Sequence, residues 1–218
     1  MSELLSRVAE LGPKGDAEKI ETLTELVEVL NPSNGNEQNR TQSESVLDNS
    51  GVVDLIITLS AATSSVNVAT PALRVLVQLA FDEDNARRLL QRCPRLIQVL
   101  MAELTPGVEI SEQVQVAALN VLCNLALDYE NTREMVTEHA PLLSLLVAKV
   151  GSESEQVQVA ALNVLCNLAL NYENKREMVT KHATLLSLLV AKVGSESEQV
   201  QVTALEVLRN LTSNNENA

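Results

Sequence analysis

The sequence SEQVQVAALNVLCNLALDYENTREMVTEHAPLLSLLVAKVGSE, residues Ser111 to Glu153, returns almost letter for letter at Ser154 to Glu196. The motif begins a third time at Ser197, so the period is 43 residues. Self-similarity at such a period is typical of α-solenoids, in which one unit cannot bury its apolar face alone and stacks on its neighbours. The substituted positions between the two copies are Asp128/Asn171, Thr132/Lys175, Glu138/Lys181 and Pro141/Thr184.

Apolar residues at helical spacing predict three helices in each unit. They are a short first helix over Thr132–His139, a second over Leu142–Val150 and a long third helix over Glu112–Leu127. Gly151 and Gly194 are expected to end the second helices. A strand is not expected, because the Leu and Val residues do not alternate with polar ones.

A more diverged copy lies upstream. ALRVLVQLAFDEDNARRLL, from Ala72 to Leu90, superimposes on the repeat at an offset of 46, and the extra three residues fit the turn at Thr105 to Gly107. Before it, Val52–Leu59 predicts a buried helix, and residues 31–45 predict a polar loop that runs into a short helix. A helix over Ser2–Leu11 and a second one capped by Asp16 are expected to cover the start of the stack.

These observations divide the chain into N-terminal capping helices with a polar loop (1–51), a diverged repeat (52–110), two close repeats (111–153 and 154–196) and a partial repeat (197–218). Asn215-Glu216-Asn217 matches the start of a further first helix. Leu205, Leu208 and Leu211 would then lack a covering layer, which predicts either a fragment of a longer array or end-to-end self-association.

Composition excludes several functions. The net charge of −13 argues against nucleic acid or an anionic membrane as the partner and favours a basic protein. Cys93, Cys123 and Cys166 lack metal spacing and predict reduced core residues, with a disulfide or reactive thiol as the alternative. We find neither a signal peptide nor a membrane-length apolar run, so a cytoplasmic location is expected, with the nucleus left open.

The ALNVLCNLA third helix, the LLSLLV helix and an Asn recurring at 124, 167 and 210 resemble the armadillo repeat, over about Val52 to the C-terminus. The resemblance implies a right-handed, all-α solenoid of three-helix repeats whose third helices line a concave groove. HEAT repeats have a similar period but usually two helices. Importin-α-like and catenin-like members generally carry a Trp four residues before that Asn. This chain has Arg74, Asn120, Asn163 and Glu206 there, so binding of nuclear-localisation signals by a Trp array is not carried over.

One polar stripe recurs on the predicted third helices, at spacings of three and four residues that keep it on one face. Its amides offer a donor and an acceptor each and so match the backbone of an extended peptide. Alternatively, the Asn124, Asn167 and Asn210 column bonds to the backbone of a neighbouring unit. The candidate binding residues are Arg74, Gln78, Gln113, Asn120, Asn124, Asp128, Gln156, Asn163, Asn167, Asn171, Glu206 and Asn210.

No catalytic, cofactor or metal constellation accompanies this stripe. His139 and His182 share one repeat position, which indicates packing or turn residues rather than a general base. The leading prediction is therefore a non-enzymatic scaffold that binds a peptide or protein surface. The first alternative is a regulator of a small GTPase with a basic tail, because the LRNLT and YENKREMV segments also resemble armadillo-type guanine-nucleotide dissociation stimulators. The second is an engineered or self-associating array.

Overall fold

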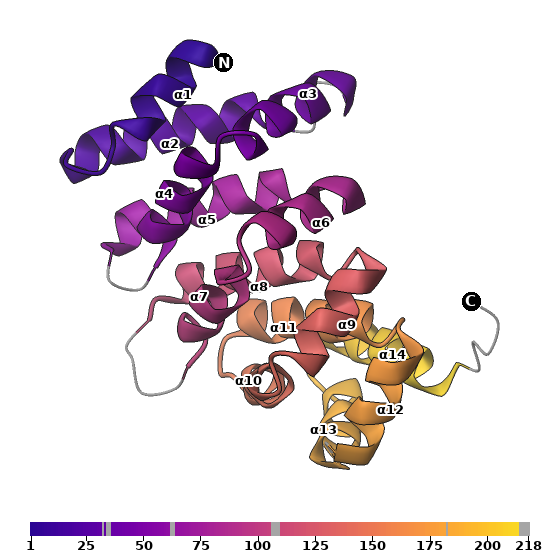
Figure 1. Cartoon of the computed structure of the whole chain (residues 1–218). Coiled ribbons are helices and arrows are strands. Elements are labelled where there is room, and N and C mark those ends of the chain that lie inside the picture. The colour runs from indigo at the N-terminus through magenta and orange to yellow at the C-terminus, as the bar shows by residue number, and fades with distance from the viewer. Residues whose placement is uncertain (32, 34–35, 62–63, 106–109, 182, 214–218) are drawn as a thin grey trace. The chain divides into compact units, whose positions relative to one another are not determined.

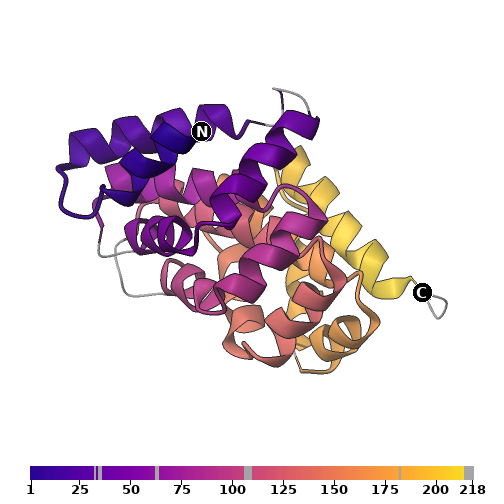
Figure 2. The same cartoon turned by 45° about the horizontal axis from the view of Figure 1, so that its top comes forward.

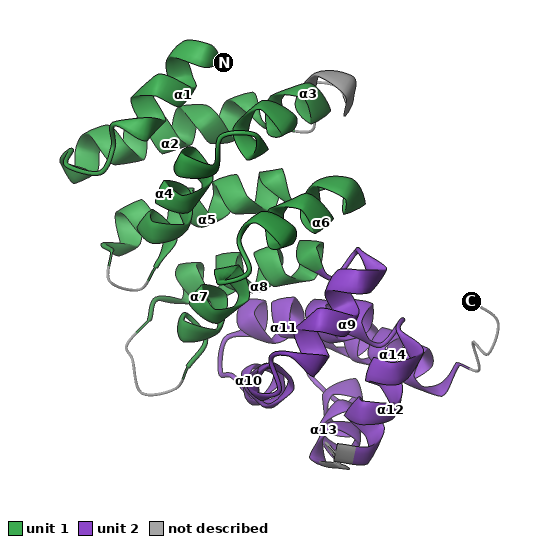
Figure 3. Cartoon of the chain, in the orientation of Figure 1, with its two compact units in different colours: residues 1–125 green, residues 126–218 purple. Residues whose placement is uncertain are grey.

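A computed structural model describes residues 1–31, 33, 36–61, 64–105, 110–181 and 183–213. All regular structure in this part of the chain is helical, as the repeat predicts (Figure 1). The chain forms two compact units, unit 1 over residues 1–125 and unit 2 over residues 126–218 (Figure 3).

Unit 1 contains eight helices in its described part. The long helix α5 contacts α2 on one side and α8 on the other, and both views of the chain show these three helices stacked side by side (Figures 1 and 2). The helices are α1 (Ser2–Ala9), α2 (Asp16–Val29), α3 (Asn36–Leu47), α4 (Ser50–Ser60), α5 (Val66–Leu79), α6 (Glu83–Arg92), α7 (Leu96–Ala102) and α8 (Glu112–Leu125).

Unit 2 contains six helices in its described part. The long helices α11 and α14 pack on each other, with α10 against α11 and α13 against α14. The helices are α9 (Tyr129–Thr137), α10 (Pro141–Val150), α11 (Glu155–Leu168), α12 (Tyr172–Lys181), α13 (Ala183–Val193) and α14 (Glu198–Thr212).

The helix order gives four groups of three: α3 to α5, α6 to α8, α9 to α11 and α12 to α14. We call the last helix of each group its third helix. The boundary between the two units falls directly after the third helix α8. The predicted repeats 111–153 and 154–196 have the same period but a different phase, because each begins with a third helix.

Side-chain caps define where these helices start. Ser154 Oγ accepts a hydrogen bond from Val157 N (3.3 Å), and Ser197 Oγ accepts one from Val200 N (3.3 Å), so each serine caps a third helix. Asp82 caps α6 in the same way by accepting from Asn85 N (2.9 Å). These caps satisfy N–H groups that have no partner within the helix. The cap predicted at Asp16 is wrong, because Gly15 is the N-cap residue and Asp16 lies inside α2.

For residues 31–45 we predict a polar loop that runs into a short helix, but the helix α3 already begins at residue 36 and ends at Leu47. Its inward face is built from Asn39, Ser43, Val46 and Leu47, of which the first two are polar but buried. The Asn39 side chain donates a hydrogen bond to the Leu30 carbonyl. Small polar residues therefore occupy core positions here, and a count of apolar residues does not detect the helix. The predicted buried helix over Val52–Leu59 is confirmed as α4.

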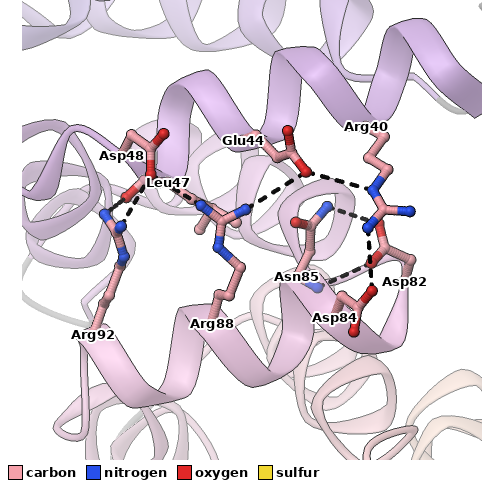
Figure 4. A network of polar contacts seen from close by, with 9 residues as sticks. All are labelled: Arg40, Glu44, Leu47, Asp48, Asp82, Asp84, Asn85, Arg88 and Arg92. Atoms are coloured by element: carbon pink, nitrogen blue, oxygen red, sulfur yellow. Dashed lines mark hydrogen bonds and ion pairs between the residues drawn. The ribbon is translucent and has the colours of Figure 1, made fainter.

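Charged side chains connect α3 to α6 (Figure 4). Arg88 contacts Asp48 at 2.9 Å and Glu44 at 3.7 Å, and Arg92 contacts Asp48 at 2.9 Å. The Arg92 guanidinium also donates to the Leu47 carbonyl at the end of α3. These groups are a third to two thirds exposed, so each pair contributes about 0 to 1 kcal/mol. Their main effect is to fix which face of α3 meets α6.

Candidate functional site

The predicted stripe lies on the third helices, but its positions differ in exposure. On α8, Gln113 and Asn120 are exposed, whereas Asn124 is half-buried. On α11, Gln156 is exposed and both Asn163 and Asn167 are half-buried. The stripe is therefore most accessible at its N-terminal and middle positions.

Asn124 connects two third helices of unit 1. Its Nδ2 donates to the Val77 carbonyl in the last turn of α5 (3.0 Å). Within an α-helix that carbonyl would accept from Phe81 N, but Phe81 N donates to Gln78 O instead (3.3 Å). The amide of Asn124 thus satisfies a carbonyl that the end of α5 leaves without its helical donor.

Asn210 does the same in unit 2. Its Nδ2 donates to the Cys166 carbonyl in the last turn of α11 (3.1 Å) and lies 3.2 Å from Cys166 Sγ. Leu170 N, the expected helical donor to that carbonyl, donates to Asn167 O (3.1 Å). Since Asn210 is only 8% exposed, its first role is to hold α14 against α11. At these two positions, the alternative of a bond to the neighbouring unit's backbone describes the amide better than an open binding role.

Asp128 and Asn171, which we placed on the exposed stripe, are buried, with exposed fractions of 0% and 1%. Each is the cap of a first helix: Asp128 Oδ1 accepts from Asn131 N (2.8 Å), and Asn171 Oδ1 accepts from Asn174 N (3.2 Å). The correction has a simple cause. The third helices end at Leu125 and Leu168, so helical spacing no longer predicts the direction of a side chain three residues later.

Exposed apolar residues flank these buried caps, and the sequence analysis did not find them. In the sequence, Leu127 and Tyr129 flank Asp128, and Leu170 and Tyr172 flank Asn171. The side chains of these four apolar residues are each about half exposed. Phe81 holds the position of Leu127 in the earlier copy and is equally exposed. All three aromatic residues of the chain thus lie on the surface, between the end of a third helix and the first turn of the next helix. Tyr129 recurs as Tyr172, and the position of Phe81 is held by Leu127 and Leu170, so this recurrence was a signal available in the sequence.

Charge differs between the middle positions of the stripe. Arg74 on α5 and Glu206 on α14 are both exposed, at the position that Asn120 and Asn163 hold on α8 and α11. Charged residues on α14 also affect the pKa of the half-buried Cys166 thiol. Burial raises its pKa, the Glu206 carboxylate raises it further, and Arg209 acts in the opposite direction.

Four predicted residues form the accessible middle of the stripe, two in each unit. Arg74 and Asn120 stand on adjacent third helices of unit 1, and Asn163 and Glu206 stand on adjacent third helices of unit 2. Of the remaining predicted residues, Gln113 and Gln156 are exposed near the N-termini of α8 and α11, and Gln78 is half-buried. We call the first four the middle column.

The described residues offer little for other chemistry. Among them, no group of three or more His, Cys, Asp or Glu side chains could hold a metal ion. None of the three cysteines forms a disulfide, and Cys93 is buried. His139 is half-buried, and its repeat partner His182 lies outside the described residues. In the part of the chain that the structure covers, no helix has the length and apolarity to span a bilayer.

Comparison with known proteins supports the architecture. A family model described as Armadillo-like matches residues 14–154. An engineered protein of known structure has a TM-score of 0.80 at 23% identity, with 97% of this chain and 80% of the other covered. A designed armadillo repeat protein in complex with the peptide (KR)4 has a TM-score of 0.64 at 20% identity, covering 96% and 99%.

A third similar structure is that of computationally designed armadillo repeat proteins for modular peptide recognition, with a TM-score of 0.64, 21% identity and coverage of 95% and 99%. No curated protein sequence matches. The predicted fold class, an all-α solenoid of armadillo-like repeats, is confirmed.

Proposed function

Because the chain belongs to the Armadillo-like family, we propose that it is a non-enzymatic scaffold in which the third helices of each unit bind an extended peptide segment of a partner protein. The observation that carries the proposal is the middle column of Arg74, Asn120, Asn163 and Glu206, whose polar side chains are not needed to fill the core. The designed armadillo proteins of similar fold, one of them in complex with (KR)4, support a peptide as the ligand.

The amides supply the sequence-independent part of recognition. Each primary amide of Asn120 and Asn163 can donate to a peptide carbonyl and accept from a peptide N–H, so neither peptide group loses its hydrogen bond on binding. A peptide bound across the two adjacent third helices of one unit would be held by its backbone, while its side chains reach the variable positions.

The charged members supply the selective part. On α14, Glu206 favours a basic peptide side chain, and the net charge of −13 favours the approach of a basic partner over longer distance. On α5, Arg74 favours an acidic side chain. The proposed ligand of unit 2 is therefore a basic segment.

Unit 2 also carries exposed apolar pairs, just before and at the start of α9 and α12. Leu127 with Tyr129, and Leu170 with Tyr172, present half-exposed apolar groups one period apart. Tyrosine is enriched at protein interfaces because its ring buries a large apolar area while its hydroxyl stays hydrated.

Regulation of a small GTPase and a cytoplasmic location remain predictions.

The test uses fluorescein-labelled (KR)4 as the probe and fluorescence anisotropy as the readout. We expect Asn120→Ala combined with Asn163→Ala to raise the Kd roughly tenfold, since each lost peptide hydrogen bond costs about 0.5 to 1.5 kcal/mol. Glu206→Gln should weaken (KR)4 and leave a (GS)4 control unchanged. Glu173→Gln on α12, an exposed acid away from the column, is the matched control.

The proposal fails if the unmodified chain does not bind (KR)4 measurably, or if the double alanine variant binds it as well as the unmodified chain. Circular dichroism of each variant separates loss of binding from loss of fold. Both amides are exposed or half-buried, so the helical signal should stay unchanged.

A further inference from the structure

The face of α14 that points away from α11 carries five exposed residues at spacings of four, three, four and three. Such spacing keeps them on one side of the helix. We call them the α14 stripe. They are Glu198, Val202, Leu205, Arg209 and Thr212.

One period earlier, the three apolar counterparts Val159, Leu162 and Ala169 are buried, Cys166 is half-buried and Glu155 is exposed. On α11, Glu155 Oε1 accepts a hydrogen bond from Ser197 Oγ at the start of α14 (2.7 Å), and Cys166 Sγ lies 3.2 Å from Asn210 Nδ2. Between these contacts, the side chain of Leu162 is fully buried. The repeat therefore builds this face of a third helix to receive another helix.

On α14 the apolar residues at the centre of this face are retained but exposed. Val159 is 9% exposed and its counterpart Val202 is 49% exposed, while Leu162 at 0% corresponds to Leu205 at 50%. The neighbouring helix α13 follows the same trend, because Val190 is 65% exposed whereas its counterpart Val147 is half-buried. The described part of unit 2 thus presents an apolar patch of the kind that marks an interaction surface.

Four of the five residues of the stripe are arranged symmetrically along the helix, and Thr212 has no mirror residue in the stripe. About the midpoint between Val202 and Leu205, each apolar residue mirrors the other, and Glu198 mirrors Arg209. At 1.5 Å per residue, both charges lie about 8 Å along the axis from that midpoint. A second α14 laid antiparallel across the first would place Val202 on Leu205 and each Glu198 beside an Arg209 of the other copy.

We propose that a second copy of this chain docks on the α14 stripe through a two-fold, antiparallel α14–α14 contact. In a two-fold interface one patch serves both partners and must therefore complement itself. The stripe meets this condition in shape and in charge. The contact is separate from the middle column, so it does not rest on the proposed peptide binding.

The repeat itself supplies a comparison. At the position of Arg209, α8 and α11 carry Cys123 and Cys166, so neither of those helices has the mirrored pair of opposite charges. The charge pattern is found on the third helix whose outer face is exposed. A stacking face used only within a solenoid would not need it.

The opposite end of the chain fits the stripe less well. Neither α1 nor α2 has an exposed large apolar residue, and acids such as Glu3, Glu18 and Glu21 on these helices are exposed. Head-to-tail stacking would place Val202 and Leu205 against this charged surface. Charge and polarity therefore favour a closed dimer over an open polymer.

Sedimentation of the full chain from 1 to 500 µM tests the proposal. We expect a monomer–dimer equilibrium with a Kd on the order of 10 to 100 µM, as for a small interface. Leu205→Glu should leave a monomer at all these concentrations. Since Leu205 is half-exposed, circular dichroism of this variant should match that of the unmodified chain.

Charge reversal tests the antiparallel register. Glu198→Arg or Arg209→Glu alone should raise the Kd roughly five- to thirtyfold, because each places like charges at both ends of the contact. The double variant should restore it, and so should mixing the two single variants. Glu173→Arg on α12 is the control for net charge and should leave the dimer unchanged.

Three results would overturn the proposal. They are a strict monomer for the unmodified chain, assemblies that grow beyond dimers with concentration, and a dimer that the double reversal does not restore. Asn163→Ala should weaken peptide binding without changing the dimer, so failure of one proposal is distinguishable from failure of the other.

Discussion

Asn210 offers the sharpest test of how the third helices are held together. Replacing it with Asp keeps the size and shape of the side chain but removes the amide donor, because a carboxylate only accepts hydrogen bonds. In the native chain, Nδ2 donates to the Cys166 carbonyl at 3.1 Å in an environment where the residue is 8% exposed. Asn210→Asp would replace this bond with two facing acceptors.

The expected cost follows from three contributions. Loss of the hydrogen bond costs about 1 kcal/mol net, and the buried carbonyl left without a donor adds about 1 kcal/mol or more. A negative charge near the C-terminus of a helix is unfavourable by about 0.3 to 1 kcal/mol. We therefore expect Asn210→Asp to destabilise unit 2 by about 2 to 3 kcal/mol. Asn210→Ala should cost about 1 kcal/mol, because the higher helix propensity of Ala offsets part of the loss.

Urea unfolding followed by circular dichroism at 222 nm measures these differences. Because the chain has two compact units, the curve should be fitted with two transitions, and only the one that reports unit 2 should move. Glu206→Gln, one turn earlier and exposed, is the control and should stay within about 0.5 kcal/mol of the unmodified chain. If Asn210→Asp were as stable as this control, the amide-to-carbonyl bond could not be what fixes α14 on α11.

Two further predictions concern unit 2. Lys175 is 8% exposed, and its Nζ donates to Ser213 O (2.8 Å) at the end of α14. Lys175→Thr, which restores the residue of the preceding copy, should therefore lower the free energy of unfolding by about 1 kcal/mol and speed amide hydrogen exchange in the last turn of α14. Unchanged exchange there would contradict this role. Burial and then Glu206 raise the pKa of Cys166, so little of its thiol is ionised at pH 8. Glu206→Gln should lower that pKa and speed the alkylation of Cys166 by iodoacetamide about twofold. An unchanged alkylation rate at pH 8 would contradict the effect of Glu206 on this thiol.

The repeat period was sufficient to predict the fold class, because near-identical copies must bury the same apolar faces against each other. Details inside each unit were predictable where the helix continued. Asn120 and Asn163 lie within helices, and Asn120 is exposed whereas Asn163 is half-buried. The stripe failed at Asp128 and Asn171, because both residues follow the end of a helix and turn inward as caps.

The early start of α3 and the exposure of Leu127 and Tyr129 were not predicted, for a different reason. The helix α3 buries Asn39 and Ser43, so its core face lacks the apolar residues that identify a helix in sequence. Leu127 and Tyr129 look like core residues by type, yet they are half-exposed on either side of a buried carboxylate. In both cases, polar groups that need a hydrogen-bond partner at a helix end or interface determine which side chains are buried, and residue type alone does not predict this.

The location of the α14 stripe on one helix bears on how such a chain can change in length. Duplicating or deleting a whole 43-residue unit ahead of Ser197 would add or remove internal layers and leave every residue of the stripe in place. Evolution or a protein engineer could therefore lengthen the scaffold while keeping the proposed α14–α14 contact between two copies.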